Sequence, residues 1–249
     1  MKQFPECWTL VVAVGAFGLG CGPKQEGGGA AAAPTAQVAT QKSADMVGRC
    51  GPEGLIDDCE DNNNQVMKQG GRAGYWYSMV DSEGSTIEPP GGSTFTMTQG
   101  GAKGSGYAAH VKGKIPFTAK PYAGMGFNFV DPPGPYDASK YAGISFFAKR
   151  GSSGALPKVR LKIPDVNTEP NAGVCKACFN DFGADLELSE DWVEYVLTWA
   201  DAKQMPDWGD PRPPAIEPSK LYAVQWQVNT RNKEFDFWVD DIAFLGCQK

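Results

Sequence analysis

The stretch that decides the fold is LYAVQWQVNTRNKEFDFWVDDIAFLG, residues 221–246. It contains two runs rich in aromatic and β-branched residues, YAVQWQV and FDFWVDDIAFL, on either side of a polar segment. In the first run apolar residues alternate with glutamines, which is typical of a β-strand with one buried face and one face in water. The expected buried residues are Val224, Trp226 and Val228, and the expected outward residues are Gln225 and Gln227.

Eight more runs of this kind precede it, separated by clusters of glycine, proline, asparagine and aspartate. No segment with helical periodicity is longer than two turns. With 31 glycines and 19 prolines in 249 residues, the chain is rich in turn-forming residues. The sequence therefore predicts an all-β fold, an antiparallel β-sandwich of the jelly-roll type. The further strands are expected near 54–60, 74–80, 107–112, 125–130, 142–149, 157–163, 184–188 and 193–199.

Charge and residue counts exclude several classes of function. A formal net charge of −6 leaves no basic face for nucleic acid. His110 is the only histidine, which excludes a histidine-based catalytic triad and a multi-histidine metal site. The chain has no GxSxG motif, no Walker loop and no GxGxxG after a strand, and its acidic residues lie in no recognisable catalytic frame. We therefore expect a protein that is not an enzyme.

The N-terminal region has the character of an export signal. Residues 7–20 are apolar, a run too short to span a bilayer, and they end in Gly18-Leu19-Gly20-Cys21. This end resembles the lipobox of bacterial lipoproteins, which implies cleavage before Cys21, lipid on Cys21 and a place in the cell envelope; an ordinary secretory signal is the alternative. Residues 21–52 contain almost no large apolar groups and are expected to form a flexible tether before a domain at 53–249.

Five segments follow one another along residues 54–246: LIDDCED at 55–61, SKYAGISFFAKR at 139–150, VRLKIPD at 159–165, DWVEYVLTWADAKQ at 191–204 and residues 221–246. Their order resembles that of the family-11 carbohydrate-binding modules, jelly rolls of the galactose-binding-like superfamily. The resemblance implies a β-sandwich that binds a polysaccharide without cleaving it. Related jelly rolls, including the mitochondrial complex I assembly factor family, share the first and last strands, so an interaction or assembly module of the envelope is the alternative.

Acidic residues at both ends of the domain suggest calcium, which prefers six to eight oxygen ligands. In the resembling modules the first and last strands pair, and their acids hold a structural Ca²⁺. By position the ligands would be Asp58, Glu60 and Asp241, with Asp57 and Asp240 as substitutes. A solvated acidic turn is the alternative.

Five cysteines remain in the domain once the signal and Cys21 are set aside, so two disulfides and one free thiol are expected. If Asp58 lies opposite Asp241, the same strand register brings Cys50 to Cys247 and leaves Cys59 free and buried. The Cys175-Lys176-Ala177-Cys178 spacing fits either a redox motif or a structural disulfide in a loop. We expect the structural disulfide, because a turn rather than a helix follows. No second CxxC completes a zinc site.

A polar stripe runs along the outward positions of two strands. Arg160 and Lys162 alternate with buried residues in KVRLKI, and Gln225 and Gln227 do so in YAVQWQV. Amide, carboxylate and guanidinium groups can form paired hydrogen bonds with sugar hydroxyls, and aromatic rings stack on sugar C–H faces. Such a stripe is also the ordinary wet side of a sheet. Asp165 and Asn167 follow the KVRLKI strand and are expected at the exposed rim of this face. The resemblance adds cleft positions at Asp207, Trp208 and either Tyr75 or Tyr77. Val228 departs from the family, which tends to have an aromatic residue there.

Overall fold

The computed structural model describes residues 48–151 and 154–247. The predicted signal sequence, Cys21 and the tether up to residue 47 lie outside the described residues. In the described ranges no helix is long and apolar enough to cross a membrane. All ten predicted strands are present, with ends that differ by a few residues, and two short strands were not predicted.

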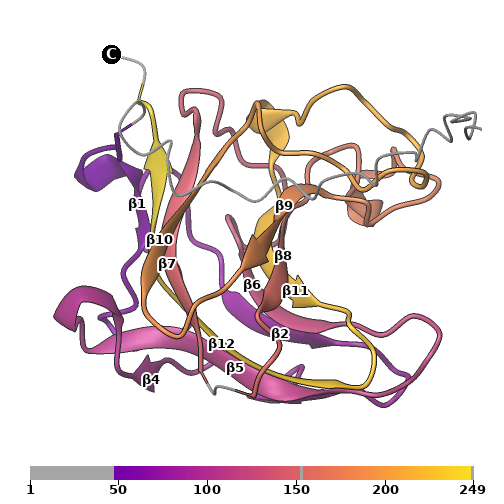
Figure 1. Ribbon diagram of the computed structural model, residues 1–249. Helices are drawn as coiled ribbons and strands as arrows, with labels where there is room; N and C mark the ends of the chain where they lie inside the picture. Colours follow the sequence, from indigo (N-terminus) through magenta and orange to yellow (C-terminus); the bar gives the residue numbers. More distant parts are fainter. Residues whose placement is uncertain (1–47, 152–153, 248–249) are drawn as a thin grey trace, which may run out of the picture. The chain divides into compact units, whose positions relative to one another are not determined.

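The strands form two antiparallel sheets that pack face to face (Figure 1). Within the described residues, one sheet has five strands in the order β2-β6-β11-β8-β9. The other has seven, in the order β10-β7-β12-β5-β3, with β1 paired to β12 and β4 to β5. The prediction of an all-β sandwich is confirmed. The strands are β1 Leu55–Asp57, β2 Trp76–Val80, β3 Thr86–Glu88, β4 Thr98–Gln99, β5 Tyr107–Ile115, β6 Ala123–Asn128, β7 Gly143–Arg150, β8 Lys158–Ile163, β9 Phe182–Glu187, β10 Val193–Thr198, β11 Ala223–Val228 and β12 Lys233–Leu245. In the same part of the chain, four short 3₁₀ turns accompany these strands, η1 Pro52–Gly54, η2 Ala102–Gly104, η3 Pro170–Ala172 and η4 Pro218–Lys220.

Strand β12 lies at the centre of the larger sheet. It pairs with β7 on one side, and on the other side first with β5 and then with β1. Its register with β7 shifts between Asp240 and Ala243, where Asp241 has a positive φ of 50°. A bulge of this kind bends a strand and re-aims its side chains. Here it leaves Asp240 buried and Asp241 partly exposed.

Aromatic rings from both sheets fill the space between them. Trp76 of β2 stacks on Trp226 of β11 with 5.9 Å between ring centroids. Phe146 of β7, in the opposite sheet, meets Trp226 edge-on at 5.1 Å. Trp226, Val224 and Val228 are almost completely buried, as their alternation predicts. The intervening glutamines therefore lie on the outer face of the five-stranded sheet.

A disulfide, a β-bridge and hydrogen bonds join the two ends of the described chain. Arg49 forms a β-bridge with Leu245 and donates hydrogen bonds to Asp241 and Ser145, and Cys50 forms a disulfide with Cys247. The folded part thus includes residues 48–52, which the sequence predicts to belong to the tether. Cys59 is a free thiol that is fully buried, and this burial raises its pKa. The predicted pairing of Cys50 with Cys247 is present, and Cys59 packs in the core.

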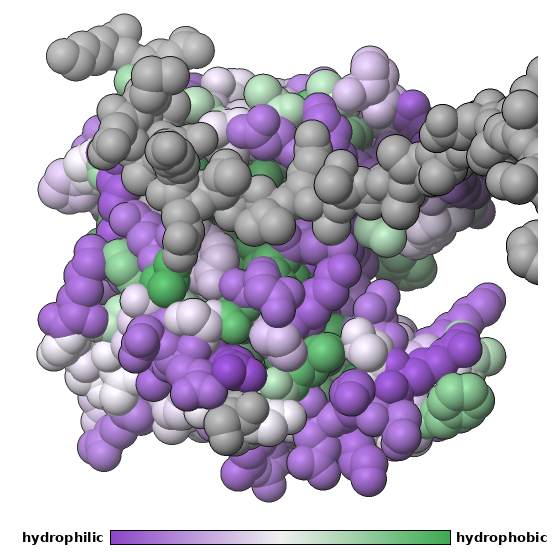
Figure 2. Space-filling view, in the orientation of Figure 1, coloured by the Kyte–Doolittle hydropathy of each residue, from purple (hydrophilic) through white to green (hydrophobic). Residues whose placement is uncertain are grey.

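The surface seen in Figure 2 is mostly hydrophilic, with hydrophobic residues in patches between the polar ones. Mixed surfaces of this kind are normal for a folded domain in water. The hydropathy of this surface therefore does not single out a binding face.

Candidate functional site

The outer face of the five-stranded sheet carries two aligned rows of residues across neighbouring strands. In one row Tyr77 is followed by Gly126, Gln225 and Lys162. In the other, Gly124 is followed by Gln227, Arg160 and Asp185. Because β6 contributes a glycine to each row, no β6 side chain lies between β2 and β11 in these two rows. A Cβ at Gly124 would lie 2.0 Å from the carbonyl oxygen of Trp226, so no larger residue fits there without a shift.

A pocket of about 320 Å³ lies over the β8 end of these rows. This volume is at the lower end of the range of small-ligand sites. Four of its lining residues were named from the sequence, namely Arg160, Lys162 and Gln227 of the polar stripe and Trp208 of the expected cleft. The other lining residues are Lys158, Phe179, Asn180, Asp181, Asp185, Met205, Asn229 and Thr230.

Paired charges form the floor of the pocket. Asp185 accepts a hydrogen bond from Arg160 at 3.2 Å and lies 3.3 Å from the Lys158 ammonium group. Lys162 and Asp181 form a largely buried ion pair at 2.9 Å. Three cationic and two acidic side chains therefore line the pocket, which leaves an excess of one positive charge. A nearly balanced set of charged donors and acceptors suits a ligand rich in hydroxyl groups better than a strongly charged one.

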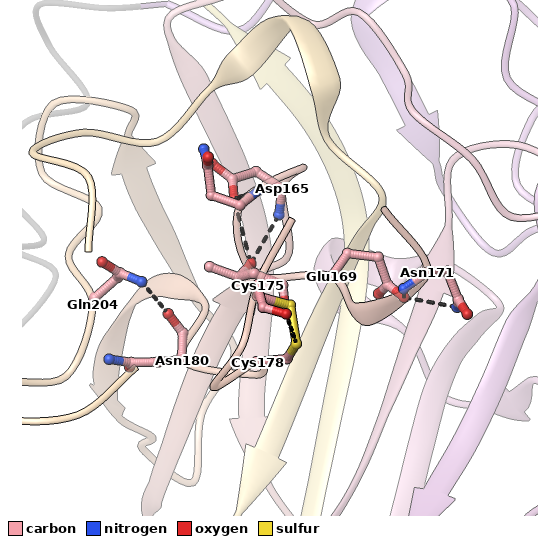
Figure 3. Close-up of a disulfide and its surroundings, with 9 residues drawn as sticks. Asp165, Glu169, Asn171, Cys175, Cys178, Asn180 and Gln204 are labelled. Atoms are coloured by element: carbon pink, nitrogen blue, oxygen red, sulfur yellow. Dashed lines mark hydrogen bonds between the residues drawn. A yellow bond between two sulfur atoms is a disulfide. The ribbon is translucent and has the colours of Figure 1, made fainter. Parts of the chain in front are cut away.

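One asparagine organises the loop that carries Trp208. The Asn180 Nδ2 group donates to the carbonyl oxygens of Met205 and Trp208, at 2.9 and 2.6 Å. Its Oδ1 accepts from the backbone N–H of Met205, and its own carbonyl accepts from Gln204 Nε2. Figure 3 shows Gln204 reaching Asn180 next to the Cys175–Cys178 disulfide. These contacts fix the backbone at Met205 and Trp208, and Trp208, which is 46% exposed, lines the pocket.

Tyr77 and Gln225 contact each other on the same face but do not line the pocket. Gln225 Nε2 donates to the Tyr77 hydroxyl oxygen at 2.9 Å, and burial raises the pKa of Tyr77. Tyr75, just before β2, is 37% exposed. The three predicted residues Tyr75, Tyr77 and Gln225 therefore lie on the outer face, on the β2 side of Gln227.

Three predicted site residues, Asp165, Asn167 and Asp207, do not line the pocket. Asp165 does not lie at the exposed rim that we expected: it is completely buried, and burial raises its pKa. Its carboxylate accepts hydrogen bonds from the backbone of Asn167 and Glu217, so it holds the loops together (Figure 3 labels Asp165 beside the disulfide). Asn167 donates its side chain back to Asp165. Asp207 is exposed next to Trp208 with a φ of 68° but does not line the pocket.

Eight pocket residues were not predicted, namely Lys158, Phe179, Asn180, Asp181, Asp185, Met205, Asn229 and Thr230. Asp185 alternates with buried residues in ADLEL, which is the one local signal that could have placed it on this face. Phe179 follows the CxxC segment in a loop, where the sequence has no periodicity to orient it.

The acidic residues of the expected calcium site are occupied by protein donors. Glu60 accepts from the backbone of Gly106 and Tyr107, and Asp241 pairs with Arg49. Burial raises the pKa of Asp57 to about 7 and that of Asp240 to about 6. No group of three or more acidic, histidine or cysteine side chains in the described ranges is arranged to hold a metal ion. Asp58 accepts a hydrogen bond from the Glu60 N–H. The residues present therefore do not form a ready calcium site, and calcium binding stays a prediction.

The fold of this chain is that of known carbohydrate-binding modules. No protein-family model and no curated protein sequence matches the chain. It is similar to a family 11 carbohydrate-binding module from Clostridium thermocellum in complex with a β-1,3-1,4-mixed-linked tetrasaccharide, with a TM-score of 0.54 and 18% identity over 79% of this chain and 96% of that one. It is also similar to the family 11 module of the cellulosomal cellulase Lic26A-Cel5E of Clostridium thermocellum, with a TM-score of 0.53 and 19% identity over 82% of this chain and 98% of that one. At these identities the similarity establishes the fold, two antiparallel sheets forming a β-sandwich.

Proposed function

We propose that the protein is a non-catalytic carbohydrate-binding module that binds a polysaccharide on the outer face of its five-stranded sheet. The observation that carries the proposal is the pocket in which an exposed tryptophan, Trp208, lies with the planar polar groups of Arg160 and Gln227. A ring for stacking beside paired hydrogen-bond donors and acceptors is the combination that sugar recognition needs. The similar module bound to a mixed-linked tetrasaccharide supports the same ligand class.

The charges of the pocket favour a neutral glycan. Each lysine and arginine of its floor has an acidic partner, and the excess is a single positive charge. A β-1,3-1,4-mixed-linked glucan is therefore the first ligand to test, followed by xylan and mannan.

Affinity electrophoresis tests the proposal directly. The purified protein should be retarded in a gel that contains mixed-linkage β-glucan, xylan or mannan, and Gln227→Ala should reduce the retardation. Incubation with the retaining polysaccharide should release no reducing ends, because the module binds without turnover. Normal mobility in all three gels would contradict the proposal and favour the interaction-module alternative.

We also propose that the module is anchored to the cell envelope by lipid on Cys21, as the apolar run before Gly20-Cys21 suggests. The mature chain should then begin at Cys21 and partition into detergent. Mass spectrometry of its N-terminus would detect the lipid. A Cys21→Ser variant that is processed normally and stays equally membrane-bound would contradict this anchor.

A further inference from the structure

Two aromatic side chains of the pocket are largely exposed. Phe179 is 59% exposed and Trp208 46% exposed, and Met205 lies with them in the same pocket. Single exposed apolar residues are common on protein surfaces. Two exposed rings at one pocket, beside its polar floor, form a local apolar surface that a ligand with C–H faces could cover.

The backbone on both sides of Phe179 is held in place. The preceding residue, Cys178, is in a disulfide with Cys175, and their Cα atoms are 5.1 Å apart. The Phe179 N–H donates to the carbonyl oxygen of Thr168 at 3.0 Å. Phe179 itself has a φ of 71°, a conformation that is costly for a bulky residue and persists only where the surroundings impose it. The loop therefore keeps Phe179 exposed at the pocket.

The residue after Phe179 connects it to Trp208. Asn180 is buried, and its side chain donates to the Trp208 carbonyl oxygen at 2.6 Å. Gly209 lies so close to Asn180 that a Cβ at position 209 would be 2.9 Å from the Asn180 Cβ. The loop that carries Phe179 and the loop that carries Trp208 are therefore packed against each other through Asn180.

We propose that Phe179 is a second sugar-stacking residue of the pocket, and that the Cys175–Cys178 disulfide is the device that positions its ring. The inference rests on the proposed glycan binding. It adds Phe179 as a stacking residue and the neighbouring disulfide as the group that positions it. Two rings at one pocket imply that the bound glycan presents more than one sugar face to the protein. The disulfide acts only through the loop and does not contact the sugar.

Phe179→Ala tests the stacking role, with Phe117→Ala as the matched control. Phe117 is also an exposed phenylalanine, at 80%, but it lies away from the pocket under the guanidinium group of Arg231. Affinity electrophoresis in mixed-linkage β-glucan, xylan and mannan gels should show about fivefold or more weaker binding for Phe179→Ala. Phe117→Ala should bind like the wild type, and Phe179→Tyr should retain most of the affinity.

A double-mutant cycle tests the positioning role of the disulfide. Cys175→Ser/Cys178→Ser should weaken binding, and adding Phe179→Ala to it should cause little further loss, because both changes remove the same ring contact. Fully additive losses would show that the disulfide does not act through Phe179. If the wild type binds a glycan and Phe179→Ala binds equally well, this inference fails while the proposed function stands; if the wild type binds none of the three polysaccharides, the proposed function itself fails.

Discussion

The two disulfides of this domain close loops of very different length. Cys50–Cys247 joins residues 197 positions apart and fastens the start of the domain to the end of its central strand β12. Cys175–Cys178 joins residues three positions apart within a loop beside the pocket. In the chain-entropy model a disulfide stabilises by restricting the unfolded chain, and the effect grows with the length of the loop that it closes. The first disulfide therefore serves the fold and the second serves the local shape of the site.

Among the tryptophans, too, one serves the fold and another lies at the site. Trp226 is completely buried between the sheets, whereas Trp208 is held at the pocket by hydrogen bonds to its backbone. On the outer face of the larger sheet, Trp238 is stacked on His110 at 3.8 Å and has the Lys149 ammonium group 5.2 Å from its ring centroid. Its faces are occupied by the chain's own side chains. Of these three rings, Trp208 is the one placed to stack on a ligand.

The largest expected effect is the loss of the long-range disulfide. Cys50→Ser/Cys247→Ser should lower the free energy of unfolding by about 5 kcal/mol, because a loop of nearly the whole domain is released in the unfolded state. Urea unfolding followed by tryptophan fluorescence measures the change. A loss no larger than that of the short-range disulfide would contradict the division between the two.

Trp226→Ala should come next, with a loss of about 3 to 5 kcal/mol in the free energy of unfolding. The substitution removes a fully buried ring that contacts Trp76 and Phe146 across the core and leaves a cavity. Trp208→Ala, its matched control, should change stability by less than about 1 kcal/mol, since the ring is half exposed. Equal destabilisation by the two variants, measured by the same urea unfolding, would place Trp208 in the core.

Removing the short-range disulfide should have a smaller effect on stability. In the same entropy model Cys175→Ser/Cys178→Ser costs about 2 kcal/mol, because the closed loop is very short. The domain should stay folded at room temperature, so that its glycan affinity can be compared with that of the wild type. Complete unfolding of this variant would show that the loop supports the sandwich and not only the pocket.

The smallest expected effect is that of calcium removal. Since Glu60 and Asp241 are already engaged by protein donors, a calcium ion would have to displace existing contacts. Chelation of divalent cations should therefore shift Tm by less than about 2 °C. A fall of several degrees on chelation, restored by added calcium and absent in Asp241→Ala, would establish the calcium site that the family resemblance implies.

The strands could be predicted because their signal is local. Alternation in YAVQWQV assigns Trp226 to the core and Gln227 to the outer face, and no knowledge of neighbouring strands is needed. Strands β3 and β4 were missed because three and two residues are too few to show a period. The pairing of Cys50 with Cys247 followed from the register of the first and last strands, which the family resemblance supplied.

The site was only partly predictable, since it depends on which strands and loops become neighbours. Arg160 and Gln227 were found from their own strands, but Asp185 reaches them through the pairing of β8 with β9. Asp165 follows a strand and was expected at the surface, yet the two loops that it binds cover it completely. Phe179 and Asn180 lie in a loop, and only the packing of that loop on residues 205–209 brings them to the pocket.

The most direct test of glycan binding at this pocket is calorimetric titration of Trp208→Ala and Trp238→Ala with the polysaccharide that retards the wild type most. Loss of one stacking ring should weaken binding of Trp208→Ala about fivefold or more. Trp238→Ala, which changes the opposite sheet, should bind like the wild type. Unchanged affinity in Trp208→Ala, or an equal loss in both variants, would contradict the assignment of the binding site to this pocket.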